Sequence, residues 1–141
     1  MDISRYFSVA GDYAVFRPSG EVSLKEAVDL GSAAIAFARS QHINKLLLVT
    51  TGLTGIKSPS PSDRFFLAHD WGAASGGAVK IACVARRELI DPDKFGVMVA
   101  RNRGEQVDVF TTKAEALAWL NGGADQKGRA AAANDGPSAR R

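Results

Sequence analysis

The chain has 141 residues, 45% of them apolar and 23% charged, which is the composition of an ordinary soluble globular domain. Its net charge of +3 divides into +1 over residues 1–120 (14 Lys/Arg, 13 Asp/Glu) and +2 over residues 121–141 (4 Lys/Arg, 2 Asp/Glu). We expect no nucleic-acid partner, since the nearly neutral fold lacks a basic face. No apolar run approaches the roughly 20 residues of a membrane span. The first residues lack the order of a secretory signal, so we expect a cytoplasmic protein.

The first half of the chain predicts two strands, a helix and a buried strand. Two β-prone runs, 5–9 and 13–16, flank a tight turn and should pair antiparallel. Ser23 and Glu26 have the spacing of a capping box, which predicts a helix from about 24 to 40. The apolar run 45–50 then predicts a strand that is buried on both faces.

A Gly/Ser/Pro-rich loop over 51–62 leads into the next predicted helix, Asp63 to about Ala74, with Ser62 as its N-cap. Two apolar rows follow this helix: Leu67 with Trp71, and Phe65 with Ala68 and Gly72. Phe66 fits neither row and lies on the charged stripe. It is therefore a candidate contact residue, unless it packs under the preceding loop.

The second half of the chain repeats the alternation of strand and helix. An apolar strand over 79–85 ends at Arg86 and Arg87. Asp91 and Pro92 predict the start of a helix that runs to about residue 102. The run 106–110 alternates, which predicts an edge strand with one wetter face.

The chain then closes with a helix and a polar tail. Thr112 and Glu115 form a second predicted capping box, for a helix that ends at residues 121–123. From there the chain loses its apolar periodicity, and we interpret 122–141 as a disordered tail.

The order ββαβαβαβα predicts a single α/β domain over 1–121, with a mixed, mostly parallel sheet of about five strands and four helices. The connections after its parallel strands should meet at one edge of the sheet. That edge would gather hydroxyls, helix amides and guanidinium groups: Thr50, Thr51, Ser58 to Ser62, Arg86, Arg87, Thr111 and Thr112. Such groups suit a phosphate or carboxylate. The alternative is that they are only caps and solubilising loops.

Cysteine and histidine are too sparse for a metal centre. Cys83 is the one cysteine, and it lies inside an apolar run, which predicts a buried core residue rather than a reactive thiolate. Neither His42 nor the His69–Asp70 pair has further ligands at metal-binding spacing. We therefore expect no metal and no cofactor.

Two stretches resemble a known family. One is Gly52-Leu53-Thr54-Gly55, set between the central strand and a serine-containing helix start and followed by a strand that begins Lys80-Ile81-Ala82. The other is the closing run VFTTKAEALAWL, from Val109 to Leu120. Over about residues 5–121 the chain resembles the STAS-like, SpoIIAA-like family of small bacterial proteins. That family is related to anti-sigma-factor antagonists and, in fold, to lipid-carrying Sec14 (CRAL-TRIO) domains.

The resemblance implies a STAS/SpoIIAA-like fold and a regulatory role. In antagonist STAS domains the central strand carries an aspartate, and phosphorylation of a serine at the next helix start switches partner binding. Ser62 is the closest positional counterpart of that serine, and Ser60 is the next. The strand here ends in Thr50 and Thr51 instead of an acid, a departure from the family pattern.

Two functional hypotheses follow, neither of them enzymatic, because no nucleophile elbow or phosphate loop is present. The first is a regulatory module that binds a protein partner through the loop and helix 51–74. Its candidate phosphoacceptor or anion-site residues are Ser62, Ser60 and Thr51, and its candidate contacts are Phe66, Asp63, Arg64, Arg86 and Arg87. The second is a domain that binds or senses a small apolar or anionic molecule, such as a lipid or nucleotide. An exposed edge strand would also permit a homodimer.

Overall fold

The computed structural model describes residues 3–122, so all but the first residue of the predicted tail lies outside the described part of the chain. The α-helices are α1 (Leu24–Ser40), α2 (Pro61–Ser75), α3 (Phe95–Asn102) and α4 (Lys113–Leu120). The strands are β1 (Phe7–Ala10), β2 (Tyr13–Phe16), β3 (Gly20–Glu21), β4 (Lys45–Val49), β5 (Leu53–Thr54), β6 (Lys80–Val84) and β7 (Val107–Phe110). Two short 3-10 helices complete the set, η1 (Ser4–Tyr6) and η2 (Arg87–Leu89).

The main sheet has five strands in the order β1-β2-β4-β6-β7. β1 pairs antiparallel with β2, and the remaining neighbours are parallel. The predicted α/β class, with a mixed and mostly parallel sheet, is therefore confirmed. A second sheet was not expected from the sequence: β3 and β5 pair in parallel beyond the carboxyl ends of β2 and β4.

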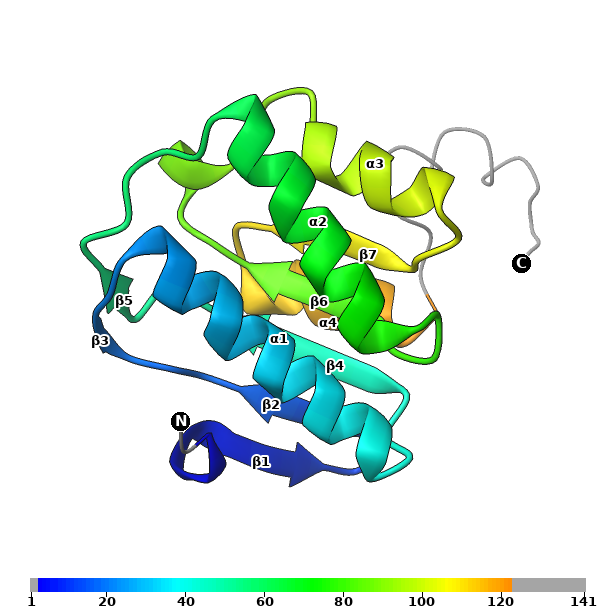
Figure 1. Cartoon of the computed structure of the whole chain (residues 1–141). Coiled ribbons are helices and arrows are strands. Elements are labelled where there is room, and N and C mark those ends of the chain that lie inside the picture. The colour runs from blue at the N-terminus through cyan, green and yellow to red at the C-terminus, as the bar shows by residue number, and fades with distance from the viewer. Residues whose placement is uncertain (1–2, 123–141) are drawn as a thin grey trace.

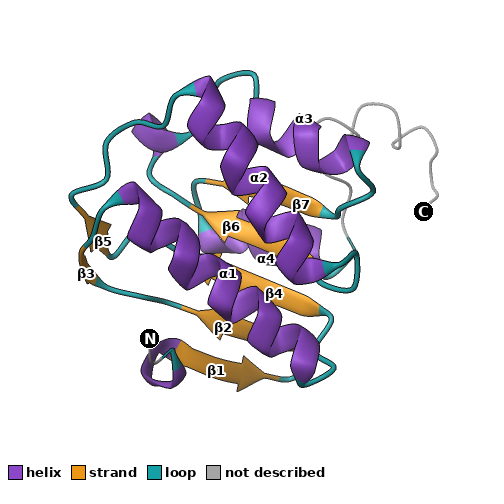
Figure 2. Ribbon diagram, in the orientation of Figure 1, coloured by secondary structure: helices purple, strands orange, loops and turns teal. Residues whose placement is uncertain are grey.

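Helices cover the sheet unequally (Figures 1 and 2). α1 and α2 lie side by side on one face, α4 lies on the other, and α3 lies beside α2 near the edge strand β7. The buried side chains of α4 form a core with Val15, Leu47 and Phe110 on their side of the sheet. On the opposite face, Ile35 of α1 and Trp71 of α2 pack against strand residues such as Leu48. No helix in residues 3–122 is both long and apolar enough to cross a bilayer.

The N-termini of α1 and α4 lie where the sequence predicts them. The Ser23 hydroxyl accepts a hydrogen bond from the Glu26 amide, and the Glu26 side chain accepts one from the Ser23 amide, which completes the capping box. Thr112 caps α4 in the same way through the Glu115 amide. The Glu115 carboxylate accepts a hydrogen bond from the Thr112 hydroxyl at 3.0 Å, whereas in a capping box it would accept one from the Thr112 amide.

α2 begins two residues earlier than the sequence predicted. Its N-cap is Ser60 rather than Ser62, and Pro61 occupies the first helical turn. The Ser60 hydroxyl accepts from the Asp63 amide at 3.1 Å, and the Asp63 carboxylate accepts from the Ser60 amide at 2.9 Å. Proline is favoured at this position, because its missing N–H would have had no partner inside the helix.

α3 begins later than predicted, at Phe95 instead of just after Asp91. The Asp91 carboxylate does accept a hydrogen bond at the helix start, from the Phe95 amide at 2.7 Å. The residues between them form a turn, and Lys94 enters the helix with a left-handed backbone at φ 50°. Asp91 thus stabilises this helix from four residues away.

The edge strand β7 was predicted correctly as an edge, but its polar side is not wet. Asp108 is only 2% exposed. Lys94 donates to its carboxylate at 2.7 Å and Arg101 at 3.1 Å, and Arg101 also donates to the backbone carbonyl of Val107. Side chains from α3 therefore cover this edge and neutralise the buried acid, which the alternation in the strand alone could not reveal.

Candidate functional site

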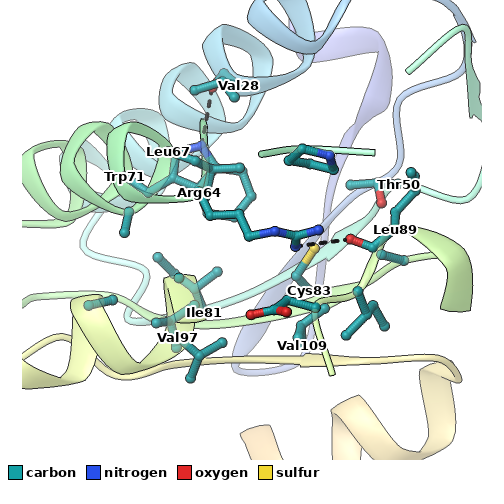
Figure 3. A pocket seen from close by; sticks show the side chains of 18 of the residues that line it. Val28, Thr50, Arg64, Leu67, Trp71, Ile81, Cys83, Leu89, Val97 and Val109 are labelled. Atoms are coloured by element: carbon teal, nitrogen blue, oxygen red, sulfur yellow. Dashed lines mark hydrogen bonds between the residues drawn. The ribbon is translucent and has the colours of Figure 1, made fainter. Parts of the chain in front are cut away.

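A cavity of about 170 Å³ lies between α1, α2, α3 and the sheet. Figure 3 shows Leu67 and Trp71 of α2 above it, Ile81 and Cys83 of β6 below it, and Val97 and Val109 beside them. Most of its lining is apolar, and Leu53, Ile56 and Pro59 contribute to it from the segment between β4 and α2. This is the size class of cavities that hold one small apolar molecule, since an engineered apolar cavity of roughly 150 Å³ binds benzene.

Arg64 brings the most prominent polar group into this space. Its guanidinium points from the first turns of α2 toward Cys83, and its Nη1 donates to the carbonyl of Leu89 at 3.2 Å (Figure 3). Arg64 also lines an outer groove, between the start of α2 and residues 87–95. The guanidinium therefore lies where the outer groove meets the inner cavity.

The cavity floor carries two weakly polar groups. Burial raises the pKa of the Cys83 thiol to about 12, despite a hydrogen bond with Thr50 that acts in the opposite direction. The Thr50 hydroxyl donates to the Val84 carbonyl at 2.9 Å. The thiol is therefore protonated at neutral pH and behaves as a small apolar group, as the sequence predicted.

The remaining charged residues of the lining differ in whether they are paired. Lys94 and Asp108 form an ion pair at 2.7 Å, and the Asp91 carboxylate accepts a hydrogen bond from the Phe95 amide. Glu105 is different: its Oε1 is buried and has no hydrogen-bond partner within residues 3–122. Its carboxylate lies against Gly72 of α2, and a Cβ at that position would be 3.4 Å from Oε2.

The predicted anion site at the carboxyl edge is only partly assembled. Arg86 turns away to donate to the Leu53 carbonyl at 2.8 Å and lies 3.8 Å from Glu88, so it stabilises the β5 connection. Arg87 is exposed and lines the outer groove together with Ser58. The edge does gather the loop before α2 and the segment after β6, but the guanidinium that enters the cavity belongs to Arg64.

The candidate phosphoacceptors lie outside the cavity. The Ser60 hydroxyl is engaged as the N-cap of α2, and Ser62 is exposed in the first turn of that helix. Thr51 is exposed in the turn after β4. None of these three residues lines the cavity.

α2 also presents aromatic side chains to solvent. Phe66 is 61% exposed, which rules out burial under the preceding loop. Phe65 was predicted to lie in an apolar row, but it is 38% exposed and stacks edge-on against Phe66 with ring centroids 5.6 Å apart. The Arg103 guanidinium lies 5.3 Å from the Phe65 ring and 2.9 Å from Nδ1 of His69. Because Arg103 comes from the end of α3, the helical pattern of α2 alone does not place Phe65.

The sequence raised small-molecule binding as its second hypothesis, but it did not locate the cavity and did not single out Glu105. One available signal was the run of small residues on the helices that border it. Alanine or glycine occupies each of these lining positions: Ala27, Ala68, Gly72, Gly96 and Ala100. Small side chains permit either close packing or a void, and a pattern of apolar residues does not distinguish the two outcomes.

Comparison with known proteins assigns no family to the chain. No family model and no curated protein matches it. Among solved structures, it is similar to the NMR structure of the protein TM1081, with 16% sequence identity and a TM-score of 0.45, over 82% of this chain and 87% of that one.

Proposed function

We propose that the protein binds or senses a small, mostly apolar molecule in the cavity between its helices and its sheet. The observation that carries this proposal is the cavity itself, which combines an apolar lining with one inward guanidinium. Ligand sites commonly have this composition, with few polar groups that fix orientation. At about 170 Å³ the cavity is below the range of roughly 300 to 1,000 Å³ that suits drug-sized ligands. The ligand is therefore about the size of one substituted ring, smaller than a full lipid.

The chemistry of the lining supports binding rather than catalysis. A nucleophile must be activated by a neighbouring base or by a lowered pKa. Burial acts in the opposite direction on Cys83, whose thiol has a pKa of about 12. The Thr50 hydroxyl donates its hydrogen bond to a backbone carbonyl, that of Val84, and not to a base. The proposal is therefore of a non-enzymatic binding module.

Binding can be measured through Trp71, which lines the cavity, while Trp119 lies on the other face of the sheet. In a Trp119→Phe background, we expect para-xylene to change the Trp71 fluorescence saturably and to raise the melting temperature. Ala68→Leu should abolish both effects, because Ala68 is buried and lines the cavity. Ala73→Leu is the matched control, since Ala73 is exposed on the same helix. Identical responses of the two leucine variants would contradict binding in the cavity.

A second function is favoured by the aromatic pair on α2. We propose that Phe66 and its neighbour Phe65 contact a protein partner, in keeping with the regulatory role implied by the family resemblance. Exposed aromatic side chains are enriched at interfaces. Asp63 and the exposed Ser62 lie in the first turn of the same helix, where a phosphate on Ser62 would be stabilised by the helix amides. The remaining candidate contact, Arg87, is exposed nearby.

A pull-down tests this second function. Phe66→Ala should abolish capture of a partner and leave the fold unchanged, because the side chain is mostly in solvent. Met98→Ala is the control, since Met98 is 41% exposed on α3. Undiminished capture by the Phe66 variant would remove this surface from the interface.

A further inference from the structure

We infer that the ligand of the cavity is amphoteric: an acidic group faces Arg64, an apolar body fills the middle, and a hydrogen-bond-donating basic group faces Glu105. The inference rests on the proposed function and names its ligand class. It follows from the pairing of the charged groups around the cavity.

The Glu105 carboxylate marks one end of the site. Its Oε1 is buried without a hydrogen-bond partner in the described part of the chain. A buried acceptor of this kind is costly unless a donor reaches it. The Glu105 amide donates to the Ala100 carbonyl at 3.1 Å, which fixes the backbone there, and Gly72 leaves room for the carboxylate. An ammonium or other N–H group on a bound molecule would supply the missing donor.

The Arg64 guanidinium marks the other end. A guanidinium carries five N–H donors. Within residues 3–122 its one hydrogen bond goes from Nη1 to the Leu89 carbonyl, and no acidic side chain forms an ion pair with it. A carboxylate is the acceptor that suits the remaining donors, since it can take two of them at once.

The other charged groups of the lining do not compete for the ligand. Asp108 is paired with Lys94 and Arg101, and the Asp91 carboxylate accepts a hydrogen bond from the Phe95 amide at the start of α3. Of the charged side chains that line the cavity, Arg64 has no ion-pair partner within residues 3–122, and Glu105 has a buried oxygen without a hydrogen bond there. The same sorting excludes a ligand with two acidic ends, because one of them would face the Glu105 carboxylate.

The positions on α2 that carry Arg64 and border Glu105 indicate the length of the ligand. Arg64 and Gly72, which lies beside Glu105, are eight residues apart on α2, or about 12 Å at 1.5 Å per residue. Apolar side chains line the space between them, with Leu67 and Trp71 on the same helix. One ring with a polar group at each end fits both this length and the cavity volume.

Four probes that share one ring separate these contributions: para-xylene, 4-methylbenzoate, 4-methylbenzylamine and 4-(aminomethyl)benzoate. Titration of the Trp119→Phe protein at pH 7, followed by Trp71 fluorescence, gives the four dissociation constants. We expect each polar group to tighten binding about tenfold or more, as charge-assisted hydrogen bonds do. The probe with both groups should bind at least 100-fold more tightly than para-xylene.

Two variants assign the ends. Arg64→Met should remove the gain from the carboxylate and keep the gain from the amine. Glu105→Gln should do the reverse. It keeps the length of the side chain, and Arg64→Met keeps an unbranched apolar stem without the charge. If para-xylene binds and the polar groups add nothing, the inference is overturned and the proposed function stands. If none of the four probes binds, the proposed function itself fails. The four titrations of the Trp119→Phe protein alone decide this, even where the Arg64 or Glu105 variant does not fold.

Discussion

The two faces of the sheet use the same strands for different purposes. On one face, α4 sets large side chains against the strands: the Phe110 and Trp119 rings lie 5.9 Å apart, and Leu120 is fully buried. Lys80 extends over the Trp119 ring and donates to the Trp119 carbonyl. On the other face, small residues of α1, α2 and α3 border a cavity instead. The first face is packed with large side chains, and the second encloses a cavity, which is the ligand site that we propose.

This difference arises from side-chain size, since the alternation of the strands is the same for both faces. In β6, Ala82 and Val84 face α4, while Ile81 and Cys83 face the cavity. The strand residues are of similar bulk on the two sides. The helices differ: Trp119 and Leu120 of α4 pack directly on one face, whereas the helices on the other face combine Leu67 and Trp71 with five alanine or glycine positions around the cavity. The cavity therefore arises where the helices carry small side chains.

The largest contrast should come from truncating one leucine on each face. Leu120→Ala should lower the free energy of unfolding by about 4 kcal/mol, because a fully buried leucine leaves an unfilled void. Leu67→Ala should cost about half as much, since Leu67 is only partly buried and borders an existing cavity. Urea unfolding measures both values. Equal losses would mean that the cavity face is as tightly packed as the α4 face.

The α/β class, the antiparallel pairing of β1 with β2 and the caps of α1 and α4 were predictable because each has a local signal. Ser23 and Glu26 lie three residues apart and satisfy one another without help from the rest of the fold. At α2 both Ser60 and Ser62 are suitable N-caps. Pro61 favours Ser60, because its fixed φ and missing N–H suit the first helical position. The sequence alone did not rank these two signals correctly.

The candidate site was less predictable, because it depends on contacts between distant elements. Arg86 and Arg64 are both candidate contacts in the sequence, but only the tertiary structure separates them. Arg86 meets the carbonyl of Leu53 in β5, a strand that was not expected. Arg64 enters the cavity and meets the carbonyl of Leu89. The position of each guanidinium thus depends on a backbone carbonyl that is 25 or more residues away in the sequence.

The next largest effect concerns the edge of the sheet that closes the cavity. Asp108→Asn should lower the free energy of unfolding by about 3 kcal/mol, because Lys94 and Arg101 then lose a buried counter-charge. Urea unfolding at pH 7 measures the loss. Asp29→Asn is the control, since the Lys25–Asp29 pair is exposed and should contribute little. Comparable losses in the two variants would show that burial does not strengthen the Asp108 pairs.

A smaller effect is expected where α1 meets α2. A Cβ on Gly31 would lie 2.5 Å from the Trp71 ring, so Gly31→Ala should displace the indole and its hydrogen bond to the Val28 carbonyl. We expect a net loss of about 1 to 2 kcal/mol, because overpacking outweighs the better helix propensity of alanine. Thermal unfolding and Trp71 fluorescence test this together. Ser32→Ala is the neighbouring control and should be neutral or stabilising, since the Ser32 hydroxyl is buried without a partner in residues 3–122. An unchanged Trp71 spectrum in the Gly31 variant would contradict the close contact.

The smallest effect is a pH dependence that belongs to the cavity floor. Burial raises the pKa of Cys83 from 9.0 to about 12, so the folded protein keeps the thiol protonated where the unfolded chain ionises it. The stability linked to this group is therefore complete below pH 9 and is lost as the pH rises from 9 toward 12. At pH 10 the loss is about 1 kcal/mol, because the unfolded thiol is then mostly ionised. Cys83→Ala should flatten the stability profile between pH 8 and pH 10 by about this amount, as measured by urea unfolding. If the slopes of the two proteins coincide, the thiol is open to solvent, and the cavity floor is wetter than the apolar lining implies.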